Sequence, residues 1–277
     1  MINKSLMLRF SLFPLCFLLS LSSCGNKGER VSSSAPSTSS GDNTSLEEST
    51  NAETTEGPHI DFSDLTLTVM GDSITYGTFT DVGDSSPTSR VSNPFTSQLK
   101  EIFGLKRASN MGKNGVSISA ATYVNRTEAI SLQCVAIEAG TDIILIAGGT
   151  NDHGSDVPLG TEADTKNSSF YGGLYVLCSK LKQNHPNACI IFLTPIDKNP
   201  KDVNGAGATL EDYRIAIRKM AGDTFGFYVL EGTDIAFDAA DKSLCLDNCH
   251  PNQAGHDIIA NYLAQEMLPI LEEFFRE

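Results

Sequence analysis

Short apolar runs alternate along the chain with longer segments in which apolar residues recur every three or four positions. The runs predict strands, and the longer segments predict helices. The predicted strands are 65–70, 106–109, 142–147, 189–193 and 227–230. The predicted helices are 93–104, a short one within 128–138, 169–183, 210–221 and 253–274. The alternation predicts an α/β domain, a three-layer α/β/α sandwich around a central, mainly parallel sheet.

Two of these segments carry specific signals. The run 142–147, "DIILIA", is continuously apolar after its first residue, which is typical of a central parallel strand covered on both faces. In the segment 93–104, Asn93 is predicted to cap the helix, Pro94 to occupy its first position and Gly104 to end it.

In open α/β sheets of the predicted kind, the ligand crevice lies beyond the carboxyl ends of the strands.

The first 23 residues do not fit this domain. Lys4 and Arg9 precede an apolar run, 12–21, that is too short for a stable transmembrane helix, so residues 1–23 are predicted to be an export signal. The run ends in "LSSC", which resembles the lipobox of bacterial lipoproteins and implies that Cys24 is lipidated. The alternative is an ordinary secretory signal with an incidental cysteine.

Residues 24–58 are rich in Ser, Thr, Glu and Gly and contain almost no large apolar side chain. Such a segment cannot bury enough surface to offset the entropy of ordering, so we predict a flexible tether. The folded domain is then 59–277. Together these segments predict an exported cell-envelope lipoprotein that is anchored to a membrane through the lipid on Cys24.

The charge of the chain limits its expected partners, and its cysteine count limits the disulfides that it can form. The chain has 20 Lys and Arg against 34 Asp and Glu, a net charge of −14, so nucleic acid is not an expected partner. Removal of the signal, which contains Lys4 and Arg9, leaves 18 against 34 and a net charge of −16. With Cys24 lipidated, the domain retains an odd number of cysteines, and at least one is expected to be unpaired.

Four short motifs stand at the predicted strand ends. They are "GDSIT" with Ser73, "NMGKNG" with Gly115, "GGTND" with Asn151, and "DNCHPNQAGH" with Asp247 and His250. In this order, across the whole domain, they resemble the SGNH hydrolases, the GDSL-type esterases, whose sheet is flavodoxin-like. A G-x-S-x-G nucleophile elbow is absent, because Thr75 stands where its second glycine would be.

The resemblance implies a role for each motif residue. Ser73 is the nucleophile, His250 the general base and Asp247 the carboxylate that orients the imidazole. The oxyanion hole comprises Ser73, Gly115 and Asn151. The chemistry agrees, because a serine hydroxyl needs an adjacent base and that base needs its other nitrogen held as a donor. This reaction needs no cofactor and no metal.

The sequence also allows other interpretations of these residues. Ser73 could cap a helix, Asp72 is expected to accept backbone N–H bonds in the turn, and Asn151 could form a loop turn. Asp152 is expected to be structural. His153, His185 and His256 are expected to be surface or structural histidines.

The cluster around His250 has alternatives of its own. Cys245, Cys249, His250 and His256 could hold zinc, although that would take His250 away from Ser73. Cys245 and Cys249 could form a local disulfide or remain free thiols.

The sequence thus predicts a serine esterase that removes acetyl or other short acyl groups, with a small-acyl ester on a glycan as the expected substrate. The resemblance is strongest to carbohydrate esterases with "GTND", and the rim loops 78–92 and 153–166 are polar. The absence of Trp removes the best residue for stacking on sugars. The alternatives are a lysophospholipase or general short-chain esterase and, from another class, a noncatalytic carbohydrate-binding lipoprotein.

Overall fold

The computed structural model describes residues 60–122, 126–200 and 202–276. The predicted signal peptide, the predicted tether and Cys24 lie outside these residues, so the predictions made for them stay predictions. None of the helices in the described part of the chain combines the length and the apolar character needed to cross a membrane.

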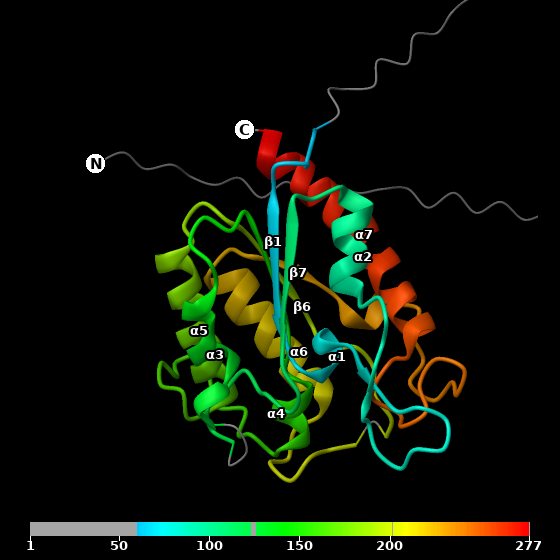
Figure 1. Cartoon of the computed structure of the whole chain (residues 1–277). Helices are drawn as coiled ribbons and strands as arrows, with labels where there is room; N and C mark the ends of the chain where they lie inside the picture. Colours follow the sequence, from blue (N-terminus) through cyan, green and yellow to red (C-terminus); the bar gives the residue numbers. More distant parts are fainter. Residues whose placement is uncertain (1–59, 123–125, 201, 277) are drawn as a thin grey trace, which may run out of the picture. The chain divides into compact units, whose positions relative to one another are not determined.

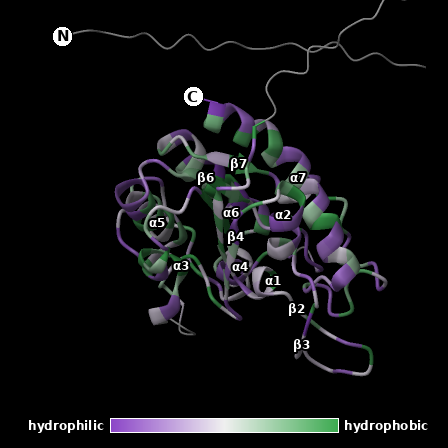
Figure 2. Ribbon diagram, turned by 45° about the horizontal axis from the view of Figure 1, so that its top comes forward, coloured by the Kyte–Doolittle hydropathy of each residue, from purple (hydrophilic) through white to green (hydrophobic). Residues whose placement is uncertain are grey.

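The centre of the domain is a five-stranded sheet in the order β4-β1-β5-β6-β7, and every neighbouring pair is parallel. Its strands are β1 (Thr66–Gly71), β4 (Arg107–Gly112), β5 (Ile143–Ala147), β6 (Cys189–Leu193) and β7 (Tyr228–Leu230). An antiparallel pair, β2 (Thr78–Phe79) and β3 (Ser89–Arg90), projects from the body of the domain (Figure 2).

Helices cover both faces of the sheet. The α-helices are α1 (Ser73–Tyr76), α2 (Phe95–Phe103), α3 (Ile130–Gln133), α4 (Thr150–Gly154), α5 (Phe170–Asn184), α6 (Leu210–Ile217) and α7 (Gln253–Arg276). α2 and α7 lie on one face, and α3, α5 and α6 lie on the other (Figure 1). Single 3₁₀ turns occupy Arg126–Glu128, Cys134–Ala136 and Gly232–Asp234. This is the predicted three-layer α/β/α fold, which is confirmed.

The central strand β5 supplies both halves of the core. Ile143 and Leu145 face α2 and α7, whereas Ile144 and Ile146 face the layer of α3, α5 and α6. All four side chains are fully buried. Successive side chains of a strand point to opposite faces, so a strand covered on both sides must be apolar at every position, as this run is.

The start of α2 differs from the prediction. Pro94, with extended backbone, stands at the cap position, and the helix begins at Phe95. Asn93 does not cap it: the Gln253 side chain accepts from the Asn93 N–H (3.0 Å) and donates to its carbonyl (2.8 Å). His256 Nδ1 accepts from the Phe95 N–H at 3.3 Å. A contact between α2 and α7 therefore replaces the local cap.

Two other boundaries differ from the prediction by three residues or more. β4 continues to Gly112, beyond the predicted end at 109, because it pairs along the whole length of β1. The helix predicted over 210–221 changes after Ile217 into a π-helical segment, Arg218–Thr224. Sequence periodicity does not separate these two helix types, which differ by one residue in hydrogen-bond spacing.

Two glycines let α1 approach the sheet closely. A Cβ on Gly112 would lie 2.2 Å from the backbone nitrogen of Tyr76, and one on Gly71 would lie 2.0 Å from the hydroxyl oxygen of Thr75. The Asn110 side chain also donates to the Thr75 carbonyl at 2.6 Å. The absence of side chains here fixes where α1, and thus Ser73, lies relative to β4.

We therefore expect Gly112→Ala to lower the free energy of unfolding by about 1–3 kcal/mol, because the neighbouring atoms are backbone and cannot move aside. Denaturant unfolding measures the effect. Gly154→Ala is the matched control, since a Cβ there meets nothing within 4 Å and the change should be neutral or slightly stabilising. Equal unfolding midpoints for the two variants would contradict this account of the α1 contact.

Candidate active site

Ser73 stands at the carboxyl end of β1, where the strand turns into α1. Asp72 caps that helix: its Oδ1 accepts from the Ile74 N–H at 2.9 Å, as expected for a turn carboxylate. Ser73 is the first helical residue, so the alternative in which its hydroxyl caps the helix is wrong. The hydroxyl has a different partner.

That partner is His250. Ser73 Oγ lies 2.8 Å from His250 Nε2, although the two residues are 177 positions apart in the chain. His250 Nδ1 lies 2.9 Å from Asp247 Oδ2. The structure therefore brings the three residues predicted for the triad into one hydrogen-bonded chain.

Asp247 accepts several further hydrogen bonds. Its Oδ1 accepts from the backbone N–H of His250 (2.8 Å) and of Cys249 (3.0 Å), and its Oδ2 accepts from the Thr80 hydroxyl (2.6 Å). Burial alone raises the pKa of Asp247, but the Thr80 and backbone hydrogen bonds and the nearby imidazole outweigh it and hold the pKa well below the ordinary value. The carboxylate is therefore ionised and fixed in position.

Thr80 is the residue of this site that the sequence did not reveal. It follows β2, is buried, and reaches Asp247 across 167 positions of sequence. Nothing in the local pattern "TFTD" distinguishes this hydroxyl from the other Ser and Thr residues of the same polar loop. Only the docking of the β2–β3 pair beside the loop that carries Asp247 gives it a role.

Gly115 lies in the loop that follows β4. The Lys113 N–H donates to the Gly71 carbonyl at 3.1 Å, which extends the β1–β4 contact, and the Thr78 hydroxyl donates to Asn114 Oδ1 at 2.7 Å. Gly115 has φ of +72°, in the region that favours glycine. Within the described part of the chain no acceptor is bonded to its N–H.

Asn151 is the second residue of α4, which follows β5, and it contacts the same loop. Its Nδ2 donates to the Val116 carbonyl at 2.8 Å, which leaves the second amide hydrogen for another acceptor. The next residue, Asp152, is fully buried and accepts from the backbone N–H groups of Ile118 (2.7 Å) and Ser119 (2.9 Å). Asp152 is thus a structural carboxylate, as expected.

Two buried carboxyl groups lie beneath the site. Burial raises the pKa of Asp72 to about 6, although the Ile74 N–H bond partly opposes the increase. Burial also raises the pKa of Asp152 to about 7, against the hydrogen bonds from Ser119 and Ile118. The negative charge of Asp72 adds to the increase at Asp152.

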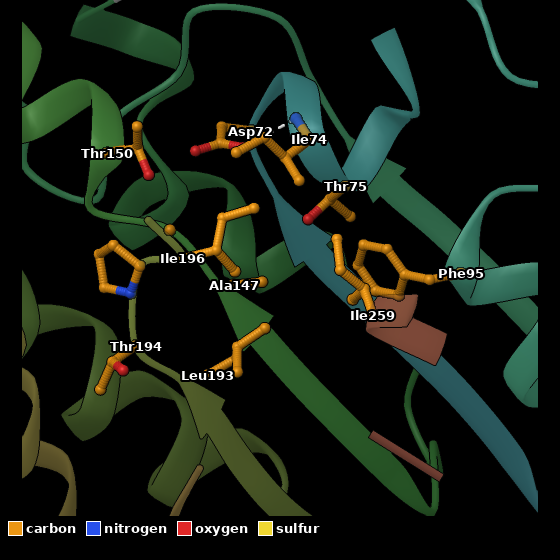
Figure 3. A pocket seen from close by; sticks show the side chains of 12 residues that line it. Asp72, Ile74, Thr75, Phe95, Ala147, Thr150, Leu193, Thr194, Ile196 and Ile259 are labelled. Atoms are coloured by element: carbon orange, nitrogen blue, oxygen red, sulfur yellow. Dashed lines mark hydrogen bonds between the residues drawn. The ribbon is translucent and has the colours of Figure 1, made fainter. Parts of the chain in front are cut away.

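A small cavity borders both sequence neighbours of Ser73 (Figure 3). It lies between Asp72 and Ile74 on one side and Ile196 on the other, with the Thr75 hydroxyl directed into it. The Thr75 hydroxyl is buried and has no hydrogen-bond partner among the described residues. The cavity volume of about 20 Å³ is enough for a group about the size of one water molecule.

The other candidate ligands do not converge on His250. His256 is buried against Phe95, and burial lowers its pKa to about 4. Cys245 and Cys249 are free thiols, and Cys245 Sγ points to Asp247 Oδ1 at 3.5 Å. Among the residues described, no group of three or more His, Cys, Asp or Glu side chains is placed to hold a metal ion. The alternative zinc site around His250 is therefore not formed by these residues.

His153 and His185 are also buried, so of the two expectations the structural one applies. His153 Nε2 lies 3.2 Å from the Asp202 carbonyl oxygen and its ring packs edge-on against Tyr213. Burial lowers the pKa of both imidazoles. Neither side chain is hydrogen-bonded to the chain of Ser73, His250 and Asp247.

The fold and this site define a class of enzyme, the hydrolases of ester bonds. The model of the GDSL-like lipase/acylhydrolase family matches residues 69–258, which include all four motifs. The chain belongs to this family, and the predicted membership in the SGNH hydrolases is confirmed. Comparison with curated proteins gave no significant match.

Solved structures share the fold. One from Lactobacillus plantarum is 28% identical, with 76% of this chain and 98% of that one covered and a TM-score of 0.63. A possible lipase from Chitinophaga pinensis DSM 2588 is 23% identical, with 75% and 99% covered and a TM-score of 0.57. The similarity to the structure from Chitinophaga pinensis supports the shared fold and nothing further.

The buried Asp72 carboxyl makes stability depend on pH. Its pKa is about 6 when folded and about 3.8 when unfolded, so the wild type loses stability as the pH rises from about 4 to about 6. In Asp72→Asn the amide oxygen can still accept from Ile74. The difference in free energy of unfolding between Asp72→Asn and the wild type should therefore increase by up to about 3 kcal/mol over that pH range. At higher pH the difference should stay constant.

Denaturant unfolding at pH 4, 5, 6 and 8 measures this difference. Asp84→Asn removes the same charge from an exposed loop and should change the unfolding free energy by less than about 0.5 kcal/mol. A gain for Asp72→Asn that is the same at every pH would show that Asp72 is not buried as a costly carboxylate.

Proposed function

We propose that this enzyme hydrolyses esters through an acyl-enzyme on Ser73, with His250 as general base and Asp247 as the orienting carboxylate. The observation that carries the proposal is the hydrogen-bonded chain from Ser73 Oγ through His250 to Asp247. A neutral imidazole that donates from Nδ1 to Asp247 has Nε2 free to accept the serine proton. Such an intact chain also disfavours a purely noncatalytic binding protein.

In the first step Ser73 Oγ attacks the ester carbonyl carbon while His250 Nε2 takes the hydroxyl proton. Asp247 accepts the Nδ1–H and stabilises the imidazolium that forms, and it remains ionised because its pKa is well below the ordinary value. The resulting tetrahedral intermediate carries a negative charge on the former carbonyl oxygen. That charge needs hydrogen-bond donors already in place.

The proposed donors are the Ser73 N–H, the Gly115 N–H and the Asn151 side-chain amide. They follow the carboxyl ends of β1, β4 and β5, which are adjacent strands with Gly71 in register with both Gly112 and Ala147. Asn151 contacts the loop of Gly115 directly through Val116. Loss of one such donor typically costs about 2.7–4 kcal/mol of transition-state stabilisation.

Collapse of the intermediate expels the alcohol, which takes its proton from the His250 imidazolium. The acyl group is then esterified to Ser73. A water molecule next loses a proton to His250 and attacks the acyl carbon, and a second collapse releases the carboxylic acid and restores the Ser73 hydroxyl.

For the substrate we propose short acyl groups, acetyl above all, on carbohydrate. The cavity bordered by Asp72 and Ile74 has room for a group no larger than a methyl, which supports a short acyl group. The polar rim loops 78–92 and 153–166 support a hydroxyl-rich alcohol. Lipid anchoring through Cys24, which remains a prediction of the sequence, would hold the domain near envelope glycans.

Ser73→Ala tests the nucleophile. Because no other hydroxyl in the described part of the chain is hydrogen-bonded to His250, the variant should lose acetate release by at least about 10³-fold and should no longer be labelled by a fluorophosphonate probe. Mass spectrometry should locate the label on Ser73 in wild type. The unfolding midpoint controls for folding, and wild-type turnover by Ser73→Ala would overturn the assignment.

The choice of acyl donor is tested on the wild type. Acetylated xylo-oligosaccharides, 4-nitrophenyl esters of two to twelve carbons and lysophospholipid are compared by kcat/KM. A higher kcat/KM for long acyl chains or for lysophospholipid than for the oligosaccharides would contradict the carbohydrate assignment. It would favour the alternatives, a lysophospholipase or a general esterase.

Thr80→Val tests the positioning of Asp247. Loss of a hydrogen bond to a charged group costs about 1.5–3 kcal/mol, so kcat should fall by about 10- to 100-fold with little change in KM. Thr80→Ser keeps the hydroxyl and should restore most of kcat. Equal kcat values for the Val and Ser variants would show that the hydroxyl does not position Asp247.

A further inference from the structure

A second cavity contains no triad residue in its lining and has no part in the chemistry above. Its volume is about 260 Å³, and it is bounded by α4, by the segment that follows β6 and by the start of α6. The polar residues around it include His153, Lys198, Asp202, Glu211 and Arg214. Pockets for drug-sized ligands have volumes of about 300–1,000 Å³, so this cavity matches a smaller unit such as one sugar ring.

The walls of the cavity are tied to the catalytic residues. The Asn199 N–H donates to the Asn248 carbonyl at 2.9 Å, and Asn248 lies between Asp247 and His250. On the opposite wall, His153 belongs to α4, two residues after Asn151. One wall of the cavity is therefore hydrogen-bonded to the loop that carries His250, and another belongs to the helix that carries Asn151.

Lys198 is the unusual residue of the cavity. Its side chain is half-buried and has no hydrogen bond or ion pair within the described residues. Lys198 and His153 line the same cavity, and burial, together with the charge of Lys198, lowers the pKa of His153. The Lys198 ammonium group can therefore donate hydrogen bonds to the oxygen atoms of a ligand in the cavity.

Arg214 makes the wall rigid. Its side chain is 7% exposed and donates to the Pro195 carbonyl (2.8 Å), to Asp197 (3.0 Å) and to Glu211 (3.3 Å). Because the guanidinium is already neutralised by two carboxylates, the cavity has no excess of positive charge for an anion. It offers fixed acceptors and a free donor in Lys198, together with apolar surface from Leu210. Sugars, with hydroxyl groups and apolar ring faces, match such a mixed lining.

We propose that this cavity binds the sugar unit that carries the ester, with Lys198 donating to its hydroxyl oxygens. The assignment rests on the function proposed above and names the part of the substrate that becomes the leaving alcohol. It makes Lys198 a specificity-determining residue rather than a catalytic one.

The test compares two acetyl esters that differ only in the alcohol. Partially acetylated xylo-oligosaccharides can occupy the cavity with hydroxyl groups, whereas 4-nitrophenyl acetate cannot. In Lys198→Met, kcat/KM for the oligosaccharides should fall by about 10-fold through loss of a charge-assisted hydrogen bond. The value for 4-nitrophenyl acetate should stay within about twofold of wild type. Lys198→Arg, which keeps a donor, should retain more of the oligosaccharide activity.

Lys100→Met is the matched control, because it removes the same charge from an exposed position on α2. Equal effects of Lys198→Met on both substrates, or no effect on either, would overturn the sugar site while the esterase stands. Wild-type hydrolysis of 4-nitrophenyl acetate but not of the oligosaccharides would overturn the ligand class. If the wild type hydrolyses neither, the proposed function itself fails.

Discussion

The parallel pairing of β1 with β4 and β5 is the constraint on which the site depends. In this register Gly71 lies opposite both Gly112 and Ala147, so three strands end at the same level. The residues that follow each strand then share one edge, although they are far apart in the chain. Because Gly71 and Gly112 have no side chains, α1 packs directly on this edge and fixes the backbone of Ser73.

Asp247 holds the other half of the site. Hydrogen bonds from Thr80 and from the backbone N–H groups of Cys249 and His250 keep its carboxylate ionised and oriented, despite partial burial. Its second role, accepting from the His250 imidazole, follows from this fixed position. The adjacent buried carboxyls, Asp72 and Asp152, differ because burial dominates and raises their pKa. The pKa of Asp247 is therefore lowered because hydrogen bonding outweighs burial, whereas the pKa values of Asp72 and Asp152 are raised because burial outweighs hydrogen bonding.

The two cavities differ in volume and in the charge of the residues that line them. The small cavity has one ionisable side chain in its lining, Asp72. The larger cavity has several charged side chains, and Arg214 pairs with two of its carboxylates. In an ester hydrolase the acyl and alcohol parts of a substrate extend in different directions from the reacting carbon. The two cavities therefore suit a short acyl group and a hydroxyl-rich alcohol, the substrate proposed above.

The sequence by itself determined the fold class, the strands β5 and β6 and the motif residues of the site. The spacing of apolar residues and the short motifs can each be recognised within a few neighbouring positions of the chain. It did not determine the start of α2, where Gln253 and His256 from α7 replace the expected Asn93 cap. Nor did it reveal Thr80 or the cavity of Lys198, since their contacts join segments that have no common local pattern. Only the tertiary structure decides such contacts, because they depend on which loops the sheet order brings to the same edge.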